Sequence, residues 1–237
     1  MSEKTMPSYT IRTMQLSDSE EVRELWSALE WDIYKYSNEM MLINDPNGVF
    51  VAQENATGKL LGVCGCVNLS PELSFVCMYA VREDCQGLGI GTALWAKGIE
   101  HMGDRNASLF AANVKMQEIY KNHHNFKAIP QRKRLLMKGK PVVNALTASI
   151  SGICLVDMND KNIADVIEYD KQVCDGVDRS AALRALNGTF DNINSVAIND
   201  NNQVMGYCVV SETVSVIVRG WGPMGAGMLD QSQTGTL

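Results

Sequence analysis

The 237-residue sequence has little positive charge and no long apolar run, and these two shortages exclude several classes of protein. Lysine and arginine number 21 against 27 aspartates and glutamates, which gives a net charge of -6 and a pI near 5.1. A general nucleic-acid binder or a protein of anionic membrane surfaces needs an excess of basic side chains, so neither partner is expected. The longest apolar stretch, near residues 60–67, is far too short to span a bilayer, and residues 1–10 are polar. We predict a soluble, unsecreted protein of the cytoplasm, with the nucleus as the alternative.

Histidine is also scarce, and the seven cysteines follow no metal-binding spacing. Cys64-x-Cys66 lacks the wider gap of structural zinc sites, and the three histidines are remote in sequence. An odd number of cysteines, mostly in apolar strand-like runs, is typical of reduced core thiols rather than of a disulfide framework. We therefore predict no metal site. A role for Cys85 as an acyl-accepting nucleophile stays open.

What the sequence does contain is a glycine-rich turn at residues 84–92, between a predicted strand over 73–81 and a predicted helix over 92–102. Because Gly87, Gly89 and Gly91 have no Cβ, the backbone can approach a ligand closely there. The N-terminus of the following helix adds unpaired N–H groups and the positive end of its dipole. Thr92 stands where a dinucleotide fingerprint or a Walker loop begun at Gly87 would need glycine, so both are excluded. The turn is predicted to hold a pyrophosphate, with a glycine turn used only for packing as the alternative.

One spacing in this turn does fit a known pattern. Gln86-x-x-Gly89-x-Gly91, preceded by Val81 at the end of a strand, resembles motif A of the GNAT acetyltransferases. The resemblance implies acetyl-CoA as co-substrate and implies that backbone groups of Tyr79 and Val81 pair with its pantetheine arm. The residues that it assigns to the pyrophosphate are Gln86, Gly87, Leu88, Gly89, Ile90, Gly91 and Thr92.

A second stretch, Asn113 followed by Tyr120 and Phe126, is similar to the Asn-x6-Tyr segment of the same family. It implies a cofactor contact for Asn113 and places Tyr120 as the general acid beside the CoA sulfur. The family usually continues with Gly-Phe, whereas here Asn125-Phe126 comes one residue later. The geometry of that turn is therefore not predicted by the resemblance.

The order of predicted elements matches the GNAT fold. We expect an α/β domain over residues 1–141 whose mixed, mostly antiparallel central sheet is flanked by helices. Its expected strands cover residues 9–14, 48–53, 59–69, 73–81 and 108–112, its helices 17–33, 34–43, 92–102 and 116–123, and a final hairpin 126–138.

The C-terminal part is predicted to be a partial second copy of this fold. Leu61-Gly62-Val63-Cys64 is echoed by Met205-Gly206-Tyr207-Cys208, and the strand before it, over 49–53, is echoed at 196–199. Residues 153–156 match the first strand and 159–173 the first helix. Residues 176–179, with Gly206-Tyr207 and residues 221–224, resemble the YitH-type acetyltransferase domain. We predict a truncated second domain over 150–237 after a linker at 141–151, and one acetyl-CoA per chain.

Acyl transfer from a thioester to an amine has two proton requirements. The acceptor ammonium, with a pKa of about 10.4, must lose a proton, and the departing thiolate, with a pKa of about 8.5, is helped by gaining one. Tyr120 is expected to supply the second proton, with a core tyrosine as the alternative. The base is unassigned, and the candidates that stay open are a water chain, Glu72, Glu30, Asp32 and Glu39. Four aromatic residues either line the acceptor site or belong to the core: Trp26, Trp31, Tyr34 and Tyr36.

These observations predict an N-acetyltransferase that moves the acetyl group directly to a small-molecule or peptide amine in a ternary complex. The alternative is a non-catalytic acyl-CoA-binding or interaction protein. Acceptor identity and oligomeric state do not follow from the residues.

Overall fold

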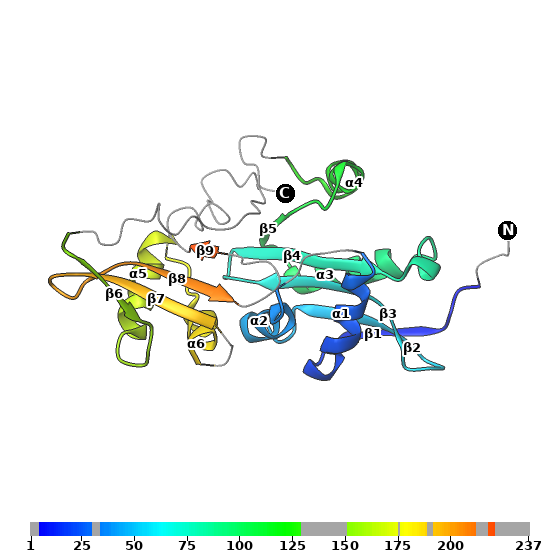
Figure 1. Cartoon of the computed structure of the whole chain (residues 1–237). Helices are drawn as coiled ribbons and strands as arrows, with labels where there is room; N and C mark the ends of the chain where they lie inside the picture. The colour runs from blue at the N-terminus through cyan, green and yellow to red at the C-terminus, as the bar shows by residue number, and fades with distance from the viewer. Residues whose placement is uncertain are drawn as a thin grey trace. The chain divides into compact units, whose positions relative to one another are not determined.

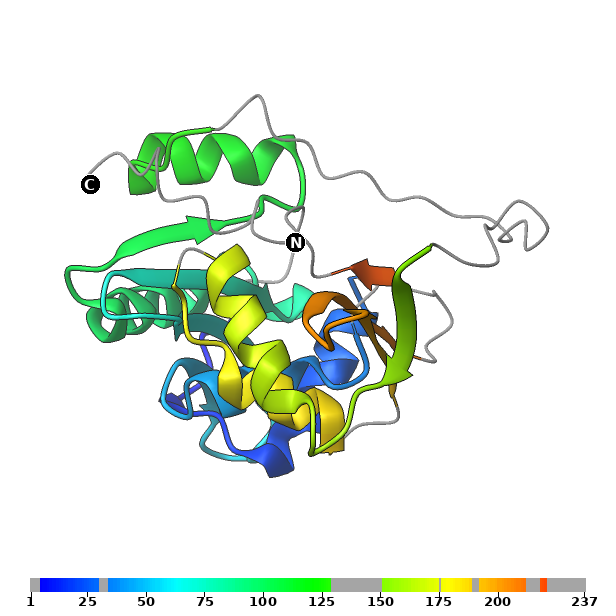
Figure 2. The ribbon, with the colours of Figure 1, turned by 90° about the vertical axis from the view of Figure 1, so that its left-hand side faces the viewer.

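The structure is a computed structural model that describes residues 5–29, 34–128, 151–174, 176–188, 192–211 and 218–220, with only the backbone of residues 211 and 218–220 (Figures 1 and 2). The chain forms two compact units, Met1–Ala112 and Asn113–Leu237. Within the described residues, no helix is both long and apolar enough to cross a membrane.

The first unit is built on a five-stranded sheet in the order β1-β2-β3-β4-β5. Neighbouring strands are antiparallel except β4 and β5, which are parallel. This confirms the predicted mixed, mostly antiparallel sheet. Its elements are β1 (Tyr9–Thr13), the 3₁₀ turn η1 (Leu16–Asp18), α1 (Ser19–Ser27), α2 (Ser37–Asn44), β2 (Val49–Glu54), β3 (Leu60–Asn68), β4 (Leu73–Val81), the 3₁₀ turn η2 (Glu83–Cys85), α3 (Ile90–Met102) and β5 (Asn106–Leu109).

Helices cover both faces of this sheet because its central strands are apolar on both sides. On one face Val22 and Trp26 of α1 pack with Val51 and Val63 in the core. On the other face α3 lies so close to β3 that a Cβ on Gly98 would be 2.4 Å from the Cys66 sulfur. The cysteines of β3 are therefore core thiols, as the sequence predicts.

The second unit contains α4 (Val114–His124) and a second, four-stranded sheet in the order β6-β7-β8-β9, antiparallel throughout. After α4 come β6 (Ile153–Asp157), α5 (Ile163–Val173), α6 (Ser180–Gly188), β7 (Asn192–Asn199), β8 (Val204–Ser211) and β9 (Val218–Gly220). From β6 on, the order of one strand, two helices and three strands repeats the order from β1 to β4.

The register of the two sheets repeats a local irregularity as well. In the first sheet Ala52 pairs with Gly62, and the next residue of β2 pairs with Leu60, so Leu61 is an extra residue. In the second sheet Ala197 pairs with Gly206, and the next residue of β7 pairs with Val204, so Met205 is extra. The two sequence segments that echo each other thus occupy the same place in their sheets.

Element boundaries differ from the expected ones at helix ends. α1 ends at Ser27 rather than near residue 33, and residues 30–33 lie outside the described residues. α3 begins at Ile90, two residues earlier than predicted, because the left-handed Gly89 already acts as its N-cap. Most of the predicted hairpin over 126–138, and all of residues 221–237, also fall outside the described part of the chain.

Candidate active site

The glycine turn ends in a helix N-terminus with no side-chain cap. Gly87 and Gly89 have φ values of 82° and 81°, and a Cβ on either would meet nothing within 4 Å. Both are therefore glycines because the left-handed backbone requires it. The first helical bond runs from the Ala93 N–H to the Gly89 carbonyl (3.0 Å), so the amides of residues 89–92 have no acceptor inside the helix.

No acidic side chain occupies the first turn of α3. α1, by contrast, has Glu20 and Glu21 in its first turn. α4 is capped, because the Asn113 side chain accepts a hydrogen bond from the Met116 N–H at 2.9 Å. The N-terminus of α3 therefore combines amides without an acceptor in the helix, the positive dipole end and a first turn without a carboxylate, which is the chemistry of an anion site.

Gly91 is a glycine for a different reason. A Cβ at this position would lie 2.6 Å from the Tyr79 hydroxyl oxygen and 3.3 Å from Cγ2 of Val81. The Tyr79 ring is held edge-to-face against Trp95, with ring centroids 5.6 Å apart. Burial raises the pKa of the Tyr79 phenol. The sequence pattern alone could not separate this packing role from close approach to a ligand.

The strand before the turn has one edge that is only partly paired. β4 pairs with β5 from Leu73 to Val76, and residues 77–81 continue beyond that pairing. On its other side β4 stays paired with β3 as far as Val81, through a register shift near which Met78 has a left-handed φ of 55°. The backbone of Tyr79 and Val81 therefore lies where, among the described strands, β4 has no neighbour toward β5.

Two side chains close the turn. Gln86 donates from Nε2 to the Val81 carbonyl at 3.1 Å, so this motif residue ties the loop to the end of β4. Arg82 pairs with Asp84 through Nη2 and Oδ2 at 2.5 Å, and this hydrogen-bonded contact lowers the pKa of Asp84. Because Arg82 neutralises the charge of Asp84, this carboxylate repels an incoming anion less.

Cys85 does not have the properties of a nucleophile. Its side chain is buried, and burial together with the neighbouring Asp84 raises the pKa of its thiol. Since the thiolate is the reactive form, the geometry gives no support to an acyl-cysteine intermediate here. Among the described residues, no cluster of three or more histidine, cysteine or acidic side chains could hold a metal ion.

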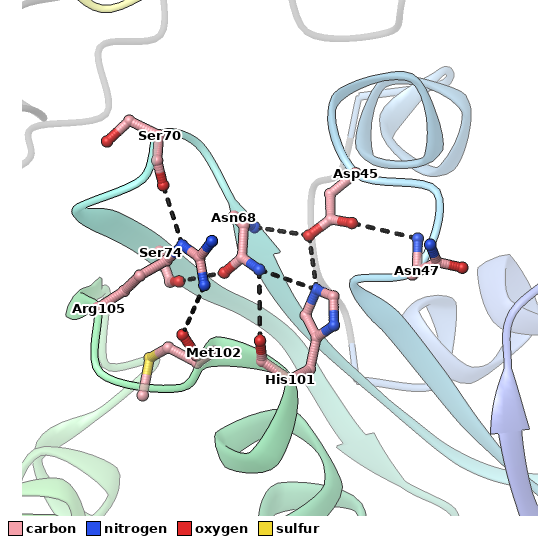
Figure 3. Close-up of polar contacts among 8 residues, drawn as sticks. All are labelled: Asp45, Asn47, Asn68, Ser70, Ser74, His101, Met102 and Arg105. Carbon is pink, nitrogen blue, oxygen red and sulfur yellow. Dashed lines mark hydrogen bonds and ion pairs between the residues drawn. The ribbon is translucent and has the colours of Figure 1, made fainter.

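A polar network that the sequence analysis missed fixes the other end of α3 (Figure 3). His101 Nε2 lies 2.7 Å from Oδ2 of Asp45, and the Asn68 backbone N–H donates to the same oxygen at 2.8 Å. Arg105 donates to the carbonyls of Met102 (3.0 Å) and Ser70 (3.1 Å). These partners come from separate parts of the chain, so no spacing could have revealed them. They pin the C-terminus of α3 and so fix the direction of its N-terminus.

Tyr120 is buried in the second unit, at 7% exposure, and its ring contacts Phe126 at a centroid distance of 6.1 Å. Asn125 ends α4 in the left-handed conformation (φ 59°), and the Phe126 N–H donates to the Tyr120 carbonyl at 3.1 Å. Asparagine tolerates this conformation, so it replaces the glycine that usually ends such a helix. The extra residue before Phe126 is thus accommodated by an ordinary helix cap.

The candidate bases are in different surroundings. Glu39 binds Arg23 through Oε1 at 3.4 Å, while its Oε2 is buried and has no hydrogen-bond partner among the described residues. Glu72 is exposed and accepts from the Ser70 hydroxyl at 3.0 Å. Glu30 and Asp32 lie outside the described residues.

Residues 9–126 match the profile of the acetyltransferase (GNAT) family. A candidate acetyltransferase from Pyrococcus horikoshii is 17% identical with a TM-score of 0.58, covering 89% of this chain and 70% of that chain. A tandem GNAT protein from the clavulanic acid biosynthesis pathway is 16% identical with a TM-score of 0.55, covering 94% and 83%. At these identities the two structures show the fold alone.

A curated relative agrees over a short stretch. A mycothiol acetyltransferase from Mycobacterium sp. (strain JLS) is 38% identical over 61 residues, which is 26% of this chain and a fifth (20%) of the relative. The family match covers the glycine turn, α3 and α4 together, although α4 belongs to the second compact unit. Through residues 9–126, the chain belongs to the acetyltransferase (GNAT) family.

Proposed function

We propose that the protein is an acetyl-CoA-dependent N-acetyltransferase that transfers the acetyl group directly to an amine in a ternary complex. The observation that carries this proposal is the uncapped, acid-free N-terminus of α3 behind the left-handed Gly87 and Gly89. Acetyl-CoA carries a diphosphate, which suits that anion site, and an extended arm, which suits the unpaired edge of β4. The residues present therefore fit the co-substrate.

In the proposed reaction the acceptor nitrogen, once deprotonated, attacks the thioester carbonyl and the C–S bond breaks. Tyr120 gives its phenolic proton to the departing sulfur, a role that rests on the family resemblance of Asn113 and Tyr120. The base is not assigned: Glu39 binds Arg23 through one oxygen while its other oxygen is sealed from solvent, whereas Glu72 is exposed, and a water chain is the other candidate.

A charge at the first turn of α3 tests the anion site with little effect on folding. Thr92 is exposed in that turn, so Thr92→Glu should leave the helix as stable or raise its stability by about 0.3–1 kcal/mol through the dipole. The same charge should weaken acetyl-CoA binding about 10- to 1000-fold by repulsion at short range. Thr92→Gln is the matched neutral control. Unchanged affinity in a folded Thr92→Glu variant would place the diphosphate elsewhere.

The competing function is a non-catalytic acyl-CoA-binding protein, and turnover separates the two. The purified chain is incubated with acetyl-CoA and a panel of small amines and peptide amino groups, and release of CoA is followed. An acceptor-dependent release supports the enzyme. Tight binding without release, across the whole panel, supports the competing function.

We also propose a division of labour along the chain. Residues 1–141 form the catalytic domain that binds one acetyl-CoA, and residues 150–237 form a partial second GNAT-like domain that shapes the acceptor side or stabilises the first. The repeated order of elements and the shared register shift support this assignment. Shortening the chain after residue 140 tests it, because a folded product should still bind acetyl-CoA.

A further inference from the structure

The side chain of Tyr79 lies between the sheet and the first turn of α3. Its hydroxyl occupies the space that a side chain at Gly91 would need, 2.6 Å from the position of a Cβ there. The edge-to-face contact with Trp95 fixes the direction of the ring. Gly91 is the second residue of α3, so the phenol oxygen is next to the amides that form the anion site.

The Tyr79 hydroxyl has no recorded hydrogen-bond partner among the described residues. The hydroxyl oxygen is not sealed from solvent, and the side chain is only partly buried. A ligand can therefore reach it. Burial raises the pKa of the phenol, so it carries its proton at neutral pH and can act as a donor.

We propose that the Tyr79 hydroxyl donates a hydrogen bond to the diphosphate of the acyl donor, beside the backbone amides of residues 89–92. This inference rests on the proposed function, which supplies the diphosphate. It gives Tyr79 a side-chain role in addition to the backbone role expected for this strand. It also gives Gly91 a purpose, because only glycine leaves room for the hydroxyl at the helix terminus.

Tyr79→Phe removes the donor and keeps the ring that packs on Trp95. Affinity for acetyl-CoA, measured by calorimetry, should fall about 10- to 100-fold, the range for a hydrogen bond to a charged group. Affinity for S-acetylpantetheine, which has no diphosphate, should change less than about twofold. Tyr9→Phe is the matched control, because Tyr9 lies on β1, three strands away from β4.

Each other outcome overturns the inference. Equal losses for both ligands would place the hydroxyl at the pantetheine arm, and no loss for either would make Tyr79 a packing residue. If the unaltered chain binds S-acetylpantetheine but not acetyl-CoA, or binds neither, the proposed function itself fails. The two failures are distinguishable, because the first appears in the Tyr79→Phe variant and the second already appears in the unaltered chain.

A double-mutant cycle with Gly91→Ala gives an independent test of the geometry. In the native chain the new methyl must displace the hydroxyl, whereas in Tyr79→Phe the nearest ring atom would be Cζ, at 3.3 Å. Gly91→Ala should therefore reduce acetyl-CoA affinity at least about threefold more with Tyr79 than with phenylalanine. Additive effects of the two substitutions on affinity would show that the hydroxyl does not act there.

Discussion

The two sheets place the same kinds of residue at equivalent positions of one face. Val22 of α1 and Val166 of α5 are both fully buried, and so are Val51 of β2 and Val196 of β7. Even the turn before the first helix repeats, since the Gln15 N–H binds the Asp18 side chain and the Asn159 N–H binds the Asn162 side chain, both at 2.8 Å. One packing scheme thus serves both units.

The same face differs at one buried position. Four residues after Val22, Trp26 packs into an apolar core, while four residues after Val166 stands Asp170, with no exposure at all. Asp170 accepts hydrogen bonds from Arg179 (2.8 Å from Nε to Oδ2) and from the Tyr207 hydroxyl (2.6 Å). Burial and the contact with Asp170 raise the pKa of Tyr207. A carboxylate can be buried at this position because Arg179 and Tyr207 donate hydrogen bonds to it.

The opposite face differs more. In the first unit Leu61 is 1% exposed, and a Cβ on Gly62 would meet Leu94 of α3 at 3.1 Å. At the equivalent positions of the second unit Met205 is 51% exposed, and a Cβ on Gly206 would meet nothing within 4 Å. Among the described residues, no helix covers this face as α3 does. The proposed anion site belongs to α3, and among the described residues of the second unit no helix stands in the place of α3.

The largest effect should come from breaking the buried charge of the second unit. Asp170→Ala removes the buried carboxylate that accepts hydrogen bonds from Arg179 and Tyr207 and should lower the free energy of unfolding by about 3–5 kcal/mol. Urea unfolding measures the change, and hydrogen exchange should show the loss in α5 and β8. Asp165→Ala, an exposed change in the first turn of the same helix, is the control and should cost about 0.3–1 kcal/mol. Similar costs for the two variants would refute a buried pair.

The next effect concerns the proton donation proposed for Tyr120. Tyr120→Phe should lower kcat about 100-fold with little change in acetyl-CoA affinity, because only proton donation to the thiolate is lost. The defect should shrink as the pH rises toward the pKa of the thiol. Steady-state kinetics over pH 6–9 measure it, and a kcat equal to that of the native chain at low pH would make Tyr120 a core residue.

A matched pair of glycine substitutions compares the two sheets directly. Gly62→Ala should destabilise the protein by about 1–3 kcal/mol, because the methyl meets the Ala80 carbonyl oxygen at 2.8 Å and Leu94. Gly206→Ala has open space and should be neutral or stabilise by up to about 1 kcal/mol. Thermal unfolding of both variants gives the comparison. Equal destabilisation would mean that the second sheet is covered on this face after all.

The smallest predicted effect is a difference in how the turns at Asp18 and Asn162 respond to low pH. The hydrogen bond from Arg12 lowers the pKa of Asp18, so its stabilising contribution is present above the ordinary carboxyl pKa and is lost as the pH falls below about 4. Asn162, its counterpart, cannot titrate. Asp18→Asn should cost about 1 kcal/mol or less at neutral pH, and the cost should shrink as the pH falls through the lowered pKa of Asp18. A cost that is the same at neutral and at low pH would exclude this linkage.

Local patterns predicted most of the architecture. Hydrophobic alternation and turn residues place the described strands except β9 within a few residues, and the echo of Leu61–Cys64 at Met205–Cys208 has the same register in both sheets. The glycine turn is equally local, because its glycines and the helix that follows are contiguous. Such features depend on backbone conformation, which the residue type limits directly.

Contacts between distant residues were not predictable in this way. The glycine pattern treats Gly87, Gly89 and Gly91 alike, whereas two serve a left-handed backbone and the third makes room for Tyr79. The network of Asp45 and His101 joins the end of α2 to the end of α3, a pairing that only the folded sheet creates. A base is not assigned by the sequence for the same reason.

Calorimetric titration of the full chain with acetyl-CoA tests the central claim most directly. The proposed anion site lies at α3 of the first unit and has no counterpart among the described residues of the second, so one acetyl-CoA should bind per chain. That binding should be lost in Thr92→Glu and kept in Thr92→Gln. Two equivalents per chain, or one that survives the new charge at Thr92, would contradict the assignment.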